Sequence, residues 1–260
     1  MTWLSLFDRV SLKEFAQVDA IFVASVVSIL ALGMVMVSSA SISISETIHG
    51  HPYFFMGRQV LYLVLGLVFG WVLLSLPTQQ LQKWGILMMG LSLMLLIFVL
   101  LPGIGKSVNG SRRWINLVVF NLQASEVAKV CMVVYISGYL VRRADRLRQG
   151  WIGFILPLCL CGVFLLFLLL EPDFGASVVL LGTVMALLFL GGAPLYQFLA
   201  LMGMAVLVLA GVAVSESYRM KRLMNFIDPW ADPFNEGYQL SQALIAYGRG
   251  EWFGLGLGNS

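Results

Sequence analysis

The chain has 260 residues, of which 60% are hydrophobic and 11% are charged, and its formal net charge is +3. Soluble domains average about 45–50% apolar and about 25% charged residues, so this composition excludes an ordinary water-soluble globule and a disordered chain. The three cysteines lie in apolar runs and there are only two histidines, which excludes a disulfide scaffold and disfavours a transition-metal site. The class that remains is a membrane protein with several spans.

Apolar runs predict seven membrane helices. A bilayer core of about 30 Å requires about 20 helical residues. The last run, 174–215, is long enough for two helices, which Gly191, Gly192 and Pro194 separate. We therefore expect an all-α integral membrane protein, a polytopic helical bundle with seven transmembrane helices. The runs that contain them are, in chain order, residues 20–45, 59–82, 84–105, 114–141, 149–170 and 174–215.

These spans predict three regions. Residues 1–18 mix apolar and charged side chains and form an N-terminal cytoplasmic or interfacial segment. Residues 19–214 form the seven-helix transmembrane bundle, which includes an outside loop at 104–122. Residues 215–260 form a large periplasmic loop that is truncated at the end of the chain.

Two shorter segments refine this arrangement. The arginines of residues 142–148 form the densest short loop of cations and favour an N-terminus on the inside of the membrane. Residues 241–247 have the pattern of a short amphipathic helix at the interface.

Glu126 and Lys129 lie a few residues inside the predicted fourth span. Ionisable groups there cost about 2.5–3.5 kcal/mol each and face protein or water rather than lipid. The i, i+3 spacing puts both on one helical face. Two interpretations stay open: a structural ion pair, or the wall of a polar cavity that binds a charged substrate. Gln123 and Ser125 extend the same polar patch.

Arg112, Arg113 and Trp114 precede this patch. Paired arginines beside a tryptophan serve as interfacial anchors in many membrane proteins. Arginine is also suited to bidentate contact with phosphate. Both interpretations remain open from the residues alone.

Two turns carry paired carboxylates. Glu171 and Asp173 flank Pro172, and this pattern suits either a divalent cation or, as we favour, a solvated turn. Asp228 and Asp232 each precede a proline, and such pairs fix turns. The glycines that follow them are not preceded by a strand, so we expect no nucleotide site and no nucleic-acid partner.

Taken together, these motifs resemble the SEDS family (shape, elongation, division and sporulation) of integral-membrane peptidoglycan polymerases. The chain looks more like the division branch of that family than its elongation branch. The matching segments are residues 34–41, 110–115, 120–129, 171–175, 228–239 and 254–260.

The resemblance implies a peptidoglycan glycosyltransferase that uses lipid II to build septal glycan strands at the outer face of the bacterial cytoplasmic (inner) membrane. Its implied partners are a class B penicillin-binding protein and other divisome proteins at the division septum. Family members have about ten membrane helices, so this chain corresponds to the N-terminal part of that fold. The favoured catalytic aspartate lies beyond Ser260, so we expect the catalytic residue to be absent and the chain to be inactive alone.

The resemblance also implies roles for the residues present. Arg113 and Lys129 are expected to contact the pyrophosphate, with Glu126 holding Lys129 in place. Trp114 is expected to pack on the sugar or the prenyl chain, and Asp232 to contribute to a divalent-metal or acceptor site. A divalent cation is the one cofactor considered, and no metal ligand is assigned. The expected substrate-binding residues are Arg112, Arg113, Trp114, Glu126, Lys129 and Asp232.

Three alternative functions stay open. An intramembrane Glu/Lys pair suits a transporter that flips lipid II across the membrane equally well. A non-catalytic scaffold for division proteins is the second alternative. An elongation-type polymerase is the third, within the same family.

Overall fold

The computed structural model describes residues 19–108, 111–117, 120–215, 217–235, 237–254 and 256. The interfacial segment predicted for residues 1–18 lies outside the described residues. The chain divides into two compact units, one made of residues 77–215 and the other of residues 1–76 with 216–260. Each unit is described by itself.

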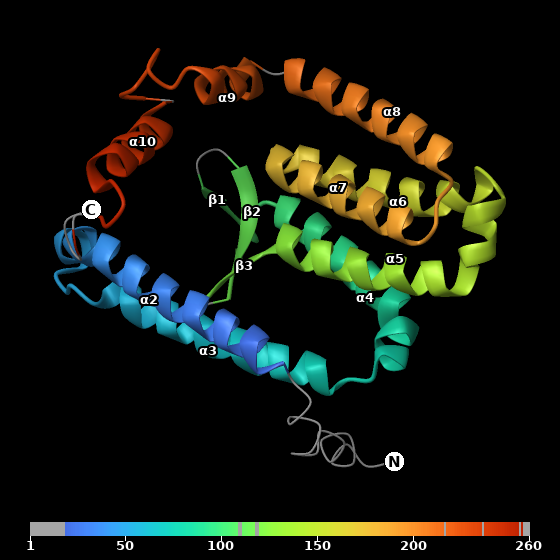
Figure 1. Ribbon diagram of the computed structural model, residues 1–260, viewed down its shortest axis with the longest axis horizontal. Helices are drawn as coiled ribbons and strands as arrows, with labels where there is room; N and C mark the ends of the chain where they lie inside the picture. Colours follow the sequence, from blue (N-terminus) through green and yellow to red (C-terminus); the bar gives the residue numbers. More distant parts are fainter. Residues whose placement is uncertain are drawn as a thin grey trace. The chain divides into compact units, whose positions relative to one another are not determined.

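In the second of these units, α2 (Ala20–His49) and α3 (Phe54–Ser75) pack side by side as a hairpin (Figure 1). Asp19 begins α2 by accepting hydrogen bonds from two backbone N–H groups of the first turn. Gly50 ends it at φ 67, a left-handed conformation that a side chain would strain. Both helices expose apolar side chains along their length, as lipid-facing helices do.

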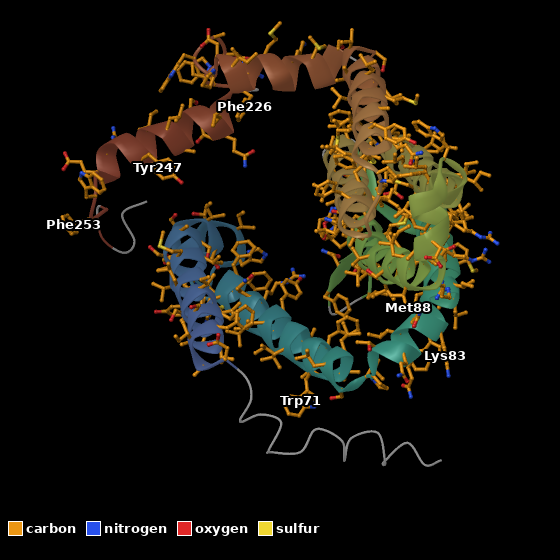
Figure 2. All side chains as sticks on the ribbon, turned by 45° about the vertical axis from the view of Figure 1, so that its right-hand side comes forward. Trp71, Lys83, Met88, Phe226, Tyr247 and Phe253 are labelled. Carbon is orange, nitrogen blue, oxygen red and sulfur yellow. The ribbon has the colours of Figure 1, made fainter. Side chains whose placement is uncertain are left out.

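The same unit contains α9 (Ser217–Ile227) and α10 (Tyr238–Gly250). The helix predicted at residues 241–247 lies within α10, and its interfacial position stays a prediction. Figure 2 shows Phe226 and Tyr247 projecting from these helices, and their side chains are exposed.

Residues 77–215 form a bundle whose central helix is α5. This helix contacts α4, α6 and α7, while α8 packs on α7. It buries Ala124, Ala128, Met132 and Ile136, which recur every four residues and so form one stripe on the helix. The helices of this bundle are α4 (Thr78–Leu100), α5 (Ala124–Gln149), α6 (Ile152–Leu170), α7 (Phe174–Leu190) and α8 (Leu195–Val214).

The break before the last predicted helix follows the sequence, whereas the predicted loop after the fourth span does not. The break predicted at residues 191–194 is confirmed, with Gly192 at φ 88 and Pro194 capping α8. The loop predicted at residues 142–148 is wrong, because α5 continues through it to Gln149. Arginine favours helix, and no breaker occurs before Gly150, so the chain only kinks at Arg143 (φ −135, ψ 25).

A small antiparallel sheet separates α4 from α5, where the prediction had an outside loop and the start of the fourth span. Its order is β1-β2-β3, with β1 (Gly105–Val108), β2 (Ser111–Asn116) and β3 (Asn121–Gln123). The span therefore begins at Ala124 rather than near Trp114. A short apolar run is ambiguous between strand and helix, so the apolar residues after Trp114 do not by themselves distinguish a strand from the start of the span. In Figure 1 the sheet lies at one end of the α4–α7 bundle.

The predicted fold class is confirmed as a polytopic helical membrane protein. Within the described ranges, six helices are long and apolar enough to cross a bilayer, and α7 is a shorter apolar helix of 17 residues. The sheet is the one departure from an all-α fold in the described part of the chain.

Replacing Gly153 by alanine should destabilise the bundle. A Cβ at Gly153 would lie 2.5 Å from the backbone of Arg146 and Leu147, where neither atom is a flexible side-chain end. Overpacking of this kind costs about 1–3 kcal/mol. We expect a lower Tm in detergent for Gly153→Ala than for the unchanged protein.

Gly162→Ala in the same helix is the matched control, because its Cβ would meet nothing within 4 Å. Its Tm should stay the same or rise slightly, since alanine favours helix. Equal Tm changes in the two variants would contradict the packing described for Gly153.

Candidate functional site

Residues of β2 contact the bundle near the turn between α6 and α7. The register of β2 against β1 shifts between Lys106 and Ser107, so side chains do not alternate strictly along this strand. The Ser111 hydroxyl donates to the backbone carbonyl of Glu171. The Arg113 Nη1 atom lies 3.3 Å from Oδ1 of Asp173, and Ile115 packs against the apolar core. The strand is thereby fixed to the bundle through both polar and apolar contacts.

Asp173 joins three elements through one carboxylate. Oδ1 accepts a hydrogen bond from the backbone N–H of Ala176 at 3.2 Å and so caps α7. Oδ2 accepts from the Ser125 hydroxyl at 3.3 Å and from Nε2 of Gln123 at 3.4 Å. With the Arg113 ion pair, these contacts connect β2, the start of α5 and the start of α7.

The turn favoured at residues 171–173 is present, but its solvated character is wrong. Glu171 is 0% exposed and Asp173 is 5% exposed. The strands of residues 111–123 fold against this turn, and the residues around 171 gave no indication of that long-range contact.

Glu171 has no hydrogen-bond partner for either carboxylate oxygen. Its pKa is raised to about 8, chiefly by burial and also by the nearby charge of Asp173, while Arg113 opposes the shift. Glu171 is therefore mostly neutral at pH 7. Asp173 is the carboxylate of this turn that forms the ion pair with Arg113.

Glu126 and Lys129 form the ion pair that their spacing indicates. Nζ of Lys129 lies 2.8 Å from Oε1 of Glu126, and the side chains are 24% and 59% exposed respectively. Lys129 lies four residues after Ser125, so it occupies the same face of α5, one turn beyond the contact with Asp173.

The two cations predicted to act together have different acidic partners. Arg113 pairs with Asp173 and Lys129 pairs with Glu126. Among the described residues, no hydrogen bond or ion pair joins Arg113 to Lys129. They are related only indirectly, because Ser125, on the face of α5 that carries Lys129, donates to the partner of Arg113, Asp173.

Arg112 and Trp114 flank Arg113 on β2, at the point where the register against β1 shifts. Arg112 is exposed and Trp114 is half-buried. Trp114 is paired in register with Lys106 of β1 and Gln123 of β3. The two adjacent arginines therefore differ in their surroundings, because Arg112 is exposed and Arg113 is paired with Asp173.

Asp232 belongs to the other unit, with residues 1–76 and 216–260. Its Oδ1 accepts a hydrogen bond from Nδ2 of Asn235 at 2.9 Å, and its backbone carbonyl accepts from the N–H of Gly237. Asp232 thus stabilises a local turn before α10. In the part of the chain that the structure describes, no group of three or more His, Cys, Asp or Glu side chains is placed to hold a metal.

Sequence reasoning singled out Arg113, Glu126 and Lys129, and it noted Gln123 and Ser125 as polar neighbours. It missed the importance of Asp173, which it treated as a turn residue. The available signal was the position of this aspartate directly before an apolar helical run, which is typical of an N-cap. That signal predicts the contact with Ala176 but not the contact with Arg113.

Comparison with known proteins gives consistent results. Residues 19–260 match the FtsW/RodA/SpoVE family, described as "Cell cycle protein". A probable peptidoglycan glycosyltransferase FtsW of Marinomonas mediterranea is 74% identical over 98% of this chain and 63% of the relative. A protein of the same description from Hahella chejuensis is 48% identical over 93% of this chain and 61% of the relative. The chain thus spans less than two thirds of the length of these relatives.

Solved structures agree with this match. The chain is similar to one described as "Structural coordination of polymerization and crosslinking by a peptidoglycan synthase complex", with TM-score 0.64, 28% identity, and coverage of 84% of this chain and 63% of that one. It is also similar to the rod shape determining protein RodA of Thermus thermophilus, with TM-score 0.54, 25% identity, and coverage of 83% and 72%. The resemblance to SEDS polymerases, and to their division branch, is confirmed.

The Glu171 carboxyl should make stability depend on pH. Its folded-state pKa of about 8 exceeds the ordinary value of 4.5, so the stability contributed by its neutral form is complete below 4.5 and is lost as pH rises to about 8. We expect the Tm in detergent to fall between about pH 5 and pH 8, and Glu171→Gln, which cannot ionise, to reduce that fall.

Glu126→Gln is the control, because this side chain is 59% exposed and its substitution should leave the slope unchanged. A Tm slope for Glu171→Gln equal to that of the unchanged protein would show that Glu171 is not the buried titrating group.

Proposed function

Because the chain belongs to the FtsW/RodA/SpoVE family of cell cycle proteins, we propose that the intact protein is a peptidoglycan glycosyltransferase that polymerises lipid II into septal glycan during division. The observation that carries this proposal is the 74% identity to a protein named FtsW across nearly the whole chain. The multi-pass helical bundle is the kind of scaffold that a lipid-linked substrate requires.

The departing pyrophosphate of lipid II requires positive groups that are already in place before the reaction. Arg113 meets Asp173 through Nη1, and a guanidinium carries further N–H donors in a planar fork that suits phosphate oxygens. Its side chain is anchored at Nη1 and is 25% exposed, so it is not fully buried. We assign Arg113 the main contact with the pyrophosphate.

Lys129 is assigned the second contact. It lies on the face of α5 that carries Ser125 and so extends the polar cluster along the helix. Glu126 orients its ammonium group at 2.8 Å. As a compact charge, lysine neutralises phosphate without the geometric demands of arginine.

The remaining predicted residues take supporting roles in the proposal. Trp114 packs on a sugar or the prenyl chain, and the exposed Arg112 adds positive charge. Asp232 contributes to the acceptor site.

The partners and place of action follow from the family. We propose a class B penicillin-binding protein and other division proteins as partners, at the septum in the bacterial inner membrane. The similarity to a structure of a peptidoglycan synthase complex supports an assembly of this kind.

A lipid II transporter is the rival function that the Glu126–Lys129 pair also suits, because an ionisable pair near a span can line a polar passage. Vesicles that contain the intact protein and lipid II separate the two functions. The polymerase account predicts glycan polymer, whereas transport alone would give movement of lipid II between leaflets with no polymer.

Arg113→Ala and Lys129→Ala in the intact protein should each reduce glycan synthesis about tenfold or more, because a preplaced cation for the leaving group is lost. Polymer formed from lipid II is measured by gel, and membrane insertion is checked in parallel.

Lys83→Ala is the matched control. Lys83 is an exposed cation near the start of α4 (Figure 2). The sheet that carries Arg113 follows the opposite end of that helix, so Lys83 is not part of the candidate site. Its glycan synthesis should be unchanged. Unchanged synthesis in Arg113→Ala and Lys129→Ala would remove both residues from the site.

A further inference from the structure

We propose that Asp173 is a positioning residue that holds the guanidinium of Arg113 in the orientation that receives the pyrophosphate of the lipid substrate. This inference rests on the proposed function and deepens it. The sequence predicts a solvated turn at Asp173, whereas the structure buries this residue beside Arg113.

The first argument is that Asp173 is itself fixed. Its carboxylate accepts hydrogen bonds from the backbone of Ala176 and from the side chains of Ser125 and Gln123. These donors come from two helices and from the strand that precedes α5. A carboxylate held by several donors from packed elements has little freedom to move.

The second argument is that Arg113 needs such an anchor. An arginine side chain has many rotamers, and ordering it costs conformational entropy. Arg113 projects from a strand with its side chain 25% exposed, and the contact of its Nη1 with Asp173 is its ion pair. An arginine ordered before the substrate arrives does not lose that freedom on binding.

The third argument is that Asp173 acts through Arg113 rather than on the substrate. The residue is 5% exposed and both of its oxygens already accept hydrogen bonds. Its neighbour Glu171 is buried without hydrogen-bond partners and lies beside the same arginine in the cluster. Asp173 is therefore the carboxylate in this turn that meets the guanidinium directly.

Asp173→Asn is the sharpest test, because asparagine has nearly the same shape and its one acceptor oxygen can keep the cap of α7. Its NH2 group replaces Oδ2, where it can donate to the Ser125 hydroxyl while the contact with Gln123 is lost. The substitution removes the negative charge that faces Arg113. In the intact protein we expect KM for lipid II to rise about fivefold while kcat stays within about twofold, because Arg113 keeps its charge for the reaction and loses only its ordering before the substrate binds.

A double variant distinguishes a positioning role of Asp173 from a general effect on the structure. In an Arg113→Ala background, Asp173→Asn should raise KM no further, since the group it positions is absent. Asp19→Asn is the matched control, because Asp19 also caps a helix and accepts only from backbone N–H groups in the contacts described. KM and kcat of this control should be unchanged.

The outcomes distinguish the two claims. If Arg113→Ala polymerises lipid II normally, the proposed role of Arg113 fails. Two other results would overturn the positioning role alone while Arg113→Ala is impaired. One is an unchanged KM in Asp173→Asn. The other is a rise in KM caused by Asp173→Asn that is the same with and without Arg113.

Ser125→Ala covers the case in which Asp173→Asn does not fold. It removes one donor to Asp173 and leaves Arg113 and the α7 cap untouched. We expect a smaller rise in KM, about twofold, that again disappears without Arg113. An unchanged KM in this variant would overturn the inference.

Discussion

The pairing of Arg113 with Asp173 is the interaction on which the candidate site depends. A charged group in a protein interior must be paired and hydrogen-bonded, because transfer from water into a low dielectric is costly. Asp173 meets this condition with donors from β2, the start of α5 and the start of α7. Loss of either charge would leave the other uncompensated, so the pair both orders the site and fixes the sheet to the bundle.

The bundle brings these groups to one place by its connectivity. The helix α5 begins at Ala124, α6 ends at Leu170 and α7 begins at Phe174. These three helix ends adjoin the same polar contacts, so the cluster lies at one end of the bundle. Since the helices are of membrane-spanning length or slightly shorter, this end corresponds to one membrane surface. The small sheet covers it (Figure 1).

Local patterns in the sequence predicted the local parts of the structure. The apolar runs gave the helices, the Gly/Pro cluster gave the break before α8, and the i, i+3 spacing gave the Glu126–Lys129 pair. The strands and the Arg113–Asp173 pair were not predictable in this way. The residues of that pair are far apart in the chain, and only the folding of β2 over the α6–α7 turn brings them together. The burial of Glu171 has the same origin.

The central claim is that an anchored arginine on this sheet receives the diphosphate of a sugar-bearing lipid. A structure of the intact protein with lipid II bound tests it most directly. Our account predicts pyrophosphate oxygens within hydrogen-bonding distance of the Arg113 guanidinium while Nη1 stays on Asp173. A pyrophosphate bound away from Arg113, or an Arg113 that leaves Asp173 to reach it, would contradict the account.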